Sequence, residues 1–151
     1  MTSSHCIFCE IVARRSPASF VYSDDHISAF MDVQPVRAGQ TLIIPNQHLD
    51  HFSDVADDVA VSMLICAQRM SRKIQNTLHP LRVGLVVHGF GVAHAHLIVV
   101  PQWKPDDIAS AQYAYMENDE IKFSIKRLPF ATREELDRLA EQLRVESLIR
   151  Q

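Results

Sequence analysis

The chain has 151 residues, of which 47% are hydrophobic and 22% are charged, values typical of one globular domain and not of a disordered, collagen-like or disulfide-rich chain. A formal net charge of −3 supplies no basic surface for the phosphates of DNA or RNA, so no nucleic-acid partner is expected. The sequence has no apolar run of membrane-spanning length, no secretory signal and only three cysteines, so we predict a cytoplasmic protein without membrane contact.

The first part of the chain predicts a short helix followed by three strands. The helix is expected over 7–14, directly after a pair of cysteines. Apolar residues alternate in the next two segments, 20–24 and 26–33, which predicts two strands joined by a tight turn. A glycine and a proline bound a third apolar segment, 39–45, which is also expected to be a strand.

The strongest helical pattern covers residues 54–78, where apolar side chains recur every three or four positions. Ser53 is the predicted N-cap of this helix, because its hydroxyl can accept a hydrogen bond from the first turn. His79 and Pro80 are expected to end it.

The second half predicts strands over 81–89, 95–101 and 120–128, and then a closing helix. Thr132, with Glu135 three residues later, forms the capping box of that helix. Its apolar stripe is expected to comprise Leu136, Leu139, Leu143, Ser147 and Leu148. The order of elements predicts the α+β class, with an antiparallel-rich sheet packed against helices in a single domain.

Two histidines, His94 and His96, occur in the stretch "VAHAHLIVVP". On a strand they would share a face with Ile98 and Val100, and both faces of that strand are mostly apolar. A buried imidazole without a hydrogen-bond partner costs about 1–3 kcal/mol, and two on one face are more than packing needs. Metal ligation, nucleophilic catalysis and plain core packing all remain open from this pattern.

Cys6 and Cys9 form a C-x-x-C pair that could be redox-active, metal-binding or merely two thiols in an apolar first turn. A thioredoxin-like role needs a βαβ setting, which the sequence does not predict. A zinc site needs four ligands, and no second pair lies at zinc-finger spacing, so further ligands would have to come from distant segments.

The segment "HAHLIVVP" resembles the signature of the histidine triad (HIT) superfamily, in which histidines alternate with apolar residues ahead of a proline. Residues 6–48 are similar to the N-terminal half of that family, and the resemblance covers about 6–103, which leaves 104–151 as a C-terminal extension of one HIT-like domain spanning 1–151. It implies a homodimer that binds purine nucleotides. Such proteins hydrolyse or transfer at the α-phosphate of phosphoramidates, adenylates or dinucleoside polyphosphates, through a nucleotidyl-histidine.

The resemblance also implies roles for individual residues. The middle histidine of the motif is the nucleophile, here His96, and we group His94 and His88 with it as catalytic residues; His88 follows "LVV", where the family often has an asparagine near the leaving group. Asp32 matches the carboxylate that binds the ribose hydroxyls, although alone it would indicate a turn. The nucleotide-binding residues predicted around the base and phosphate are Ile7, Phe8, Ile11, Phe30, Val33 and Gly91.

In zinc-bearing bacterial members of the family, two cysteines are joined by the histidine after "IPxx" and by the first histidine of the motif. The matching residues are Cys6, Cys9, His48 and His94. The resemblance therefore implies a structural Zn²⁺, since four protein ligands leave no position for water.

Two departures from the family pattern leave other functions open. Ile98 stands where the third histidine of the motif belongs, and the loop "HGFGVA" is shorter than usual. One alternative is a zinc-stabilised nucleotide-binding or sensing module with little or no catalysis. Another is a metalloenzyme in which His94, His96 and His88 surround an open zinc, although no Asp or Glu lies nearby on the motif strand.

Overall fold

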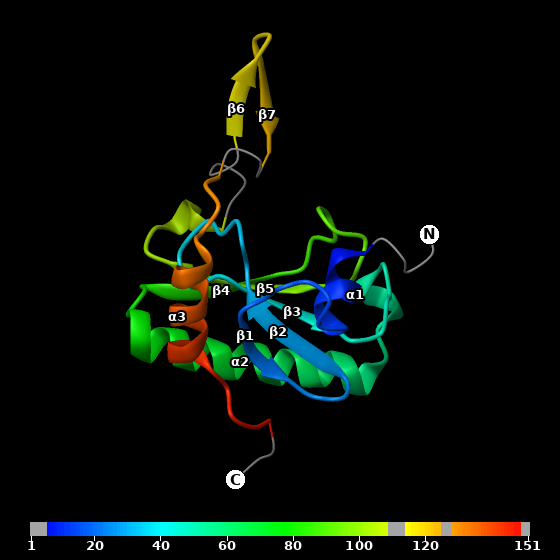
Figure 1. Ribbon diagram of the computed structural model, residues 1–151. Coiled ribbons are helices and arrows are strands. Elements are labelled where there is room, and N and C mark those ends of the chain that lie inside the picture. The colour runs from blue at the N-terminus through cyan, green and yellow to red at the C-terminus, as the bar shows by residue number, and fades with distance from the viewer. Residues whose placement is uncertain (1–5, 109–113, 125–127, 149–151) are drawn as a thin grey trace.

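The computed structural model of the protein describes residues 6–108, 114–124 and 128–148. Five strands form an antiparallel sheet, and they span Phe20–Ser23 (β1), Ile27–Met31 (β2), Thr41–Pro45 (β3), Arg82–Val86 (β4) and Leu97–Gln102 (β5). Their order across the sheet is β1-β2-β3-β5-β4 (Figure 1). The predicted α+β class with an antiparallel sheet is confirmed.

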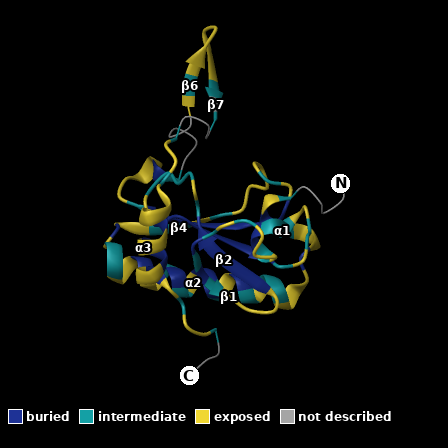
Figure 2. Cartoon of the chain, viewed as in Figure 1, coloured by how far each residue is buried: buried dark blue, intermediate teal, exposed yellow. Residues whose placement is uncertain are grey.

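Helices cover both faces of this sheet. On one face lie α2 (Asp57–Leu78) and α3 (Arg133–Leu143), which bury a large apolar cluster against the strands. On the other face α1 (Ile7–Val12) contributes two side chains to a smaller cluster that includes Ile98 and Val100. The central strands are consequently buried from both sides, as the dark ribbon of Figure 2 shows. No helix among the described residues combines the length and hydropathy that crossing a membrane requires.

The start of α2 differs from the sequence prediction. Ala56 is its N-cap, and Ser53 lies instead in a separate single turn of 3₁₀ helix, Phe52–Asp54, so the predicted cap is wrong. Two carboxylates in the first turn, Asp57 and Asp58, compensate because negative charge is favourable at a helix N-terminus. The end is as predicted, since His79 leaves the helix in a left-handed conformation with φ of 53°.

Side chains along the motif alternate as predicted, with Leu97 and Val99 in the large cluster and Ile98 and Val100 in the small one. Strand β5, however, begins only at Leu97, two residues later than predicted, so both histidines precede it. They lie in a buried segment whose backbone is fixed by other contacts. The N–H of Ala95, between the two histidines, donates to the carbonyl of Leu49 at 2.6 Å.

The C-terminal helix α3 has the predicted capping box, because Thr132 and Glu135 each accept a hydrogen bond from the other's backbone N–H. It ends at Leu143, so Ser147 and Leu148 do not belong to its apolar stripe, and that part of the prediction is wrong. Their carbonyls instead accept hydrogen bonds from Arg69 on α2.

A separate hairpin projects away from the body of the molecule (Figure 1). It consists of β6 (Ala114–Glu117), which was not predicted, and β7 (Glu120–Phe123). The predicted strand over 120–128 is thus shorter, and its positions 125–127 lie outside the described residues.

Candidate active site and metal site

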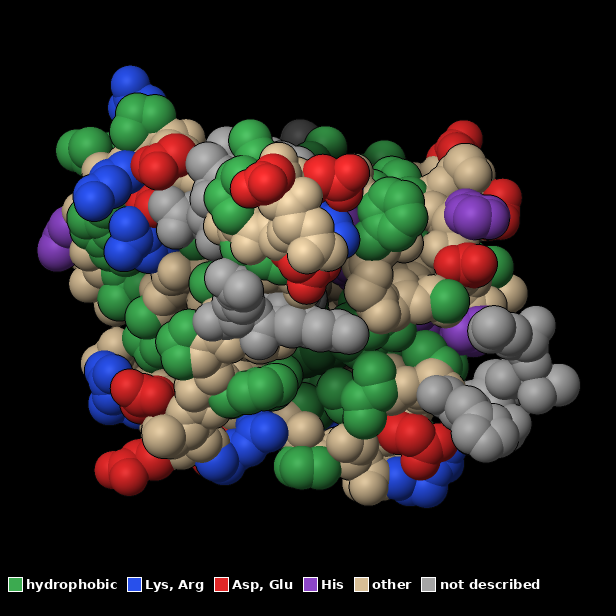
Figure 3. Space-filling model, turned by 90° about the horizontal axis from the view of Figure 1, so that it is seen from above, with side chains coloured by type: hydrophobic (Ala, Val, Ile, Leu, Met, Phe, Trp, Pro, Cys, Tyr) green, Lys and Arg blue, Asp and Glu red, His purple; other side chains and the backbone are tan. Residues whose placement is uncertain are grey.

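A cavity of about 440 Å³ opens between α1, the β2–β3 loop, the β4–β5 loop and the start of α3. Seen from the hairpin end, hydrophobic side chains gather around a hollow on this face (Figure 3). All of the predicted nucleotide-binding residues line the cavity together with the candidate nucleophile and its neighbour: Ile7, Phe8, Ile11, Phe30, Asp32, Val33, Gly91, His88 and His96. The fold therefore brings into one place residues that lie up to 89 positions apart in the sequence.

His96 has its two ring nitrogens in different surroundings. Nδ1 lies 2.7 Å from the backbone carbonyl of His94, and since a carbonyl can only accept, Nδ1 carries the proton. No hydrogen bond among the described residues occupies Nε2, which is left with a lone pair. The ring packs edge-on against Phe8, with centroids 5.7 Å apart, and is 4% exposed. This is the tautomer that a nucleophilic imidazole needs.

His88 lies beside His96, with ring centroids 5.8 Å apart and planes nearly perpendicular. Its Nδ1 accepts a hydrogen bond from the N–H of Phe90 at 3.2 Å, so in the neutral ring Nε2 carries the proton. Burial, and after it the neighbouring His96, holds the pKa of His88 below the ordinary histidine value. Near neutral pH His88 is accordingly an uncharged donor next to the nucleophile candidate.

The loop between β4 and β5 leaves room for a ligand to come close to its backbone. Gly91 has φ of 95°, a conformation that favours glycine, and nothing lies within 4 Å of the position its Cβ would occupy. The backbone N–H groups of Gly91 and Val92 have no partner among the described residues. Ile98 completes this end of the cavity with an apolar side chain in place of a third ring.

Asp32 is held by its own loop and still faces the cavity. One carboxylate oxygen accepts from the N–H of Gln34 at 2.9 Å, the turn-type contact, and the other accepts from the side chain of Gln40 at 2.6 Å. Each ionised carboxylate oxygen has a second lone pair, so the fixed group keeps acceptor capacity for two ligand hydroxyls.

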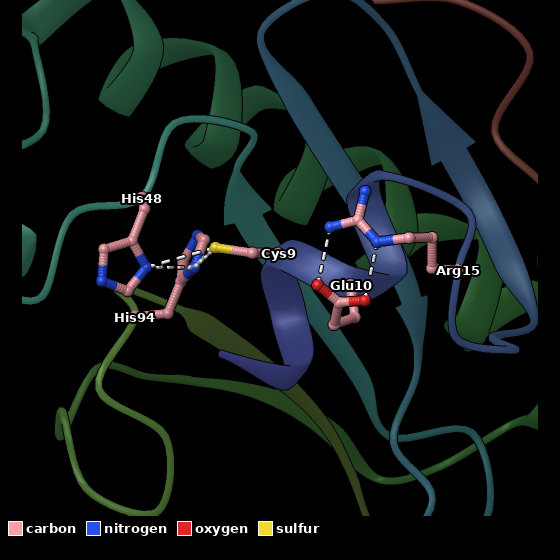
Figure 4. Close-up of polar contacts among 5 residues, drawn as sticks. All are labelled: Cys9, Glu10, Arg15, His48 and His94. Atoms are coloured by element: carbon pink, nitrogen blue, oxygen red, sulfur yellow. Dashed lines mark hydrogen bonds and ion pairs between the residues drawn. The ribbon is translucent and has the colours of Figure 1, made fainter. Parts of the chain in front are cut away.

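Four further side chains converge beside the segment that carries His94 and His96. The donor atoms of Cys6, Cys9, His48 and His94 all lie within 4.8 Å of one another. Figure 4 shows Cys9, His48 and His94 pointing toward one another from three separate segments of the chain. These are the four residues that the resemblance assigned to zinc, and neither His88 nor His96 belongs to the group.

The spacing of these atoms fits a tetrahedral zinc ion. Ordinary Zn–N and Zn–S bonds at tetrahedral angles place two nitrogens about 3.3 Å apart and a nitrogen and a sulfur about 3.6 Å apart. The two Nδ1 atoms of His48 and His94 lie 3.3 Å apart. Three of the four Sγ–Nδ1 distances are 3.3, 3.5 and 3.7 Å.

Protonation also favours a cation at this position. Nε2 of His94 donates to the carbonyl of Pro45 at 2.8 Å, which leaves Nδ1 bare and aimed at the cysteines. Burial lowers the pKa of His94, so its ring stays neutral. Burial, together with a hydrogen bond and charge from Cys6, raises the pKa of the Cys9 thiol to about 11, and a bound metal would reverse this by stabilising the thiolate.

His94, predicted to be catalytic, has a different part in the candidate site. Its side chain is fully buried and does not line the cavity, so the ring cannot touch a ligand there. What it offers to the site is its backbone carbonyl, which fixes the tautomer of His96.

Arg133 was not singled out in the sequence, yet it lines the cavity from the first position of α3. It donates to the hydroxyl of Ser19 at 2.9 Å and to the carbonyl of Pro17 at 3.5 Å. The only local pattern, an arginine just after a helix cap, indicates nothing about a ligand.

Comparison with known proteins gives a consistent result. The family model of the HIT domain matches residues 13–105. A 16.1 kDa HIT-like protein from Mycoplasma pneumoniae is 34% identical over 109 residues, which make up 69% of this chain and 76% of that protein.

Solved structures share the fold over nearly the whole chain. A Zn-bound histidine triad family protein from Mycobacterium smegmatis has a TM-score of 0.70 and 26% identity, covering 94% of this chain and 95% of that one. A hypothetical histidine triad nucleotide-binding protein from Sulfolobus tokodaii has a TM-score of 0.70 and 23% identity, covering 91% and 89% of the two chains. The HIT-like fold is therefore shared with both.

Proposed function

The chain belongs to the HIT domain family, and we propose that it hydrolyses or transfers at the α-phosphate of purine nucleotide conjugates through a nucleotidyl intermediate on His96. Phosphoramidates, adenylates and dinucleoside polyphosphates are the candidate substrates. The observation that carries the proposal is that the two ring nitrogens of His96 differ. Nδ1 donates to a carbonyl, whereas Nε2 has no hydrogen-bond partner among the described residues, and the residue lines the cavity.

The reaction follows from this geometry in two steps. The Nε2 lone pair of His96 forms a bond to the α-phosphorus, and the bond from phosphorus to the leaving group breaks, its electron pair going to the leaving group. The positive charge left on the imidazole is stabilised by the Nδ1–H donated to the His94 carbonyl. A water molecule then bonds to phosphorus, the N–P bond breaks, and its electron pair returns to Nε2.

Stabilising the leaving group is the natural task of His88. Its neutral Nε2–H can donate a hydrogen bond to the departing atom, which takes its proton from solvent, while the attacking water releases its proton to solvent. With Ile98 at the third position of the motif, His88 is the histidine that faces His96 within the cavity. The unpartnered N–H groups of Gly91 and Val92 are suited to stabilise charge on the phosphate oxygens.

The remaining lining fits the other parts of a nucleotide. Asp32 is fixed by two donors and can accept from the ribose hydroxyls. The apolar side chains at the α1 side of the cavity can enclose the flat faces of a base. This apolar set comprises Ile7, Phe8, Ile11, Phe30 and Val33.

We propose that Cys6, Cys9, His48 and His94 hold one zinc ion with a structural role. When bound, the ion would supply cross-linking of three chain segments, because four protein ligands leave no open position for water or substrate. It would fix His94, whose carbonyl holds His96. A metalloenzyme built on His88, His94 and His96 is not supported, because two of these rings lie outside the ligand group.

We also propose that the protein is a homodimer, as the family resemblance implies. Strand β4 is at the edge of the five-stranded sheet. Leu85 and Val87 on and after it are 41% and 45% exposed, and an unpaired, partly apolar edge favours pairing with another chain.

Turnover and binding separate the proposed enzyme from a nucleotide-binding module. Adenosine and guanosine 5′-phosphoramidates should be hydrolysed to the monophosphates with release of ammonia, and chromatography can measure this turnover. Calorimetry should show that the monophosphates bind. Binding of AMP and GMP without turnover of either phosphoramidate would favour the binding module, for which Ile98 is the structural argument.

Replacing His88 with alanine should lower kcat/KM for a phosphoramidate by about 100-fold, because loss of a hydrogen-bond donor to charge that develops in the transition state costs on that scale. The loss should shrink for a nucleotide ester with a good leaving group, because a stable leaving group depends less on such a donor. His26→Ala, an exposed histidine outside the cavity, serves as the matched control.

A loss in His88→Ala that is equal for good and poor leaving groups would contradict the role of His88 as a hydrogen-bond donor to the leaving group.

A further inference from the structure

Arg133 is the one lysine or arginine among the described residues that line the cavity. Its guanidinium is held in place by the Ser19 hydroxyl and the Pro17 carbonyl. Ser19 in turn donates to Asp137, one turn further along α3. The remaining N–H donors of Arg133 have no partner among the described residues, so a preorganised donor group faces a site proposed to bind nucleotides.

From the packing of aromatic rings we infer that Arg133 lies away from His96 along the cavity. A row of aromatic rings runs from His96 through Phe8 and Phe30 to Phe20, with neighbouring centroids 5.4 to 5.9 Å apart. Phe20 directly follows Ser19, the residue that anchors the guanidinium. The phosphate must contact His96, so this spacing places Arg133 away from the phosphate.

The segment before α3 runs along the wall proposed for the base. The N–H of Ala131 donates to the carbonyl of Val33 at 2.9 Å, and the side chain of Gln34 donates to the carbonyl of Leu128 at 2.7 Å. These contacts fix the start of α3 beside Val33, and with it Arg133.

We propose that Arg133 selects the base, favouring guanine and hypoxanthine over adenine. A guanidinium offers donors only, and guanine presents two adjacent acceptors, N7 and O6, whereas adenine presents one acceptor next to an amino donor. The paired donors of a guanidinium therefore match the N7/O6 edge of guanine and conflict with the amino group on the same edge of adenine. This inference rests on the proposed function, since it concerns the base of the same bound nucleotide.

Calorimetry with GMP, IMP, 7-deaza-GMP and AMP tests the assignment on the full chain. Wild-type protein should bind GMP and IMP about tenfold more tightly than AMP, and 7-deaza-GMP should lose part of that advantage. In Arg133→Ala the ratio of GMP to AMP affinity should fall to about one, mainly through weaker GMP binding. Arg133→Lys, which keeps the charge and loses the fork, should also lose most of the preference.

Two matched variants separate recognition from folding. Arg138→Ala removes an exposed arginine from the same helix and should leave the ratio unchanged. Ser19→Ala removes the anchor of the guanidinium while keeping Arg133, and should reduce the preference in part.

Several results would overturn the assignment. A wild-type GMP to AMP ratio of one, or a ratio that Arg133→Ala leaves unchanged, would exclude base selection by Arg133 while the proposed function stands. An equal weakening of GMP and AMP, larger for GDP than for GMP, would assign Arg133 to phosphate instead. Failure of wild-type protein to bind any of these nucleotides would overturn this assignment and the proposed function together.

Discussion

Replacing His96 with alanine should reduce turnover of nucleoside phosphoramidates by about 10⁴-fold or more, because the variant has no atom that can form the bond to phosphorus. Wild-type protein mixed with substrate and quenched in base should carry one added nucleotidyl group, visible as a mass increase of the intact chain. The added mass should be absent in His96→Ala. Peptide mapping of the wild-type adduct should place it on the peptide that contains residue 96.

The variant should still fold and bind nucleotide, which separates chemistry from structure. Alanine leaves the His94 carbonyl and the metal ligands untouched, so AMP or GMP should bind within about an order of magnitude of wild type, and the zinc content should be unchanged. His26→Ala should behave as wild type in both assays. An adduct or full turnover that persists without His96 would exclude this histidine as the nucleophile.

Replacing Cys9 with serine should remove the metal and lower the melting temperature by at least about 10 °C, because a lost structural zinc removes several kcal/mol of stabilisation. Wild-type protein should contain close to one zinc per chain by mass spectrometry of the metal. Treatment with a strong chelator should reproduce the loss of stability, and added zinc should restore it in the wild type alone.

The third cysteine offers a matched control. Cys66 is fully buried in the large cluster behind the sheet and lies outside the ligand group, so Cys66→Ala should keep its zinc even where packing is weakened. Wild-type protein that is free of metal and gains no thermal stability from zinc would contradict the site. Rapid loss of activity on chelation, with the fold intact, would instead indicate catalytic zinc.

The sequence was sufficient for those parts of the site that depend on local pattern or on the family resemblance. The alternation after His96 predicted correctly which side chains face each cluster, because strand geometry is local. The four metal-site residues came from a family pattern, since Cys9 and His94 are far apart in the chain and only tertiary folding brings them within 3.7 Å.

What the sequence could not predict depends on contacts between segments. Arg133 enters the cavity only because Ala131 and Leu128 bond to the β2–β3 loop, and nothing in their neighbours indicates that. Ser53 has the right chemistry for a helix cap, but Phe52–Asp54 forms its own turn before α2 begins. Capping and helix propensities rank the possible start positions of a helix but do not decide which one the fold uses.

His94 supports its surroundings with two chemically independent groups, an imidazole at the metal site and a peptide oxygen two residues before the proposed nucleophile. Every amino acid has that oxygen, so a histidine is needed at position 94 for its ring at the zinc site and not for its contact with His96. Depriving the protein of zinc should therefore loosen the peptide group that orients the neighbouring ring as the fold itself weakens, and a related chain without the ion could carry another residue at this position.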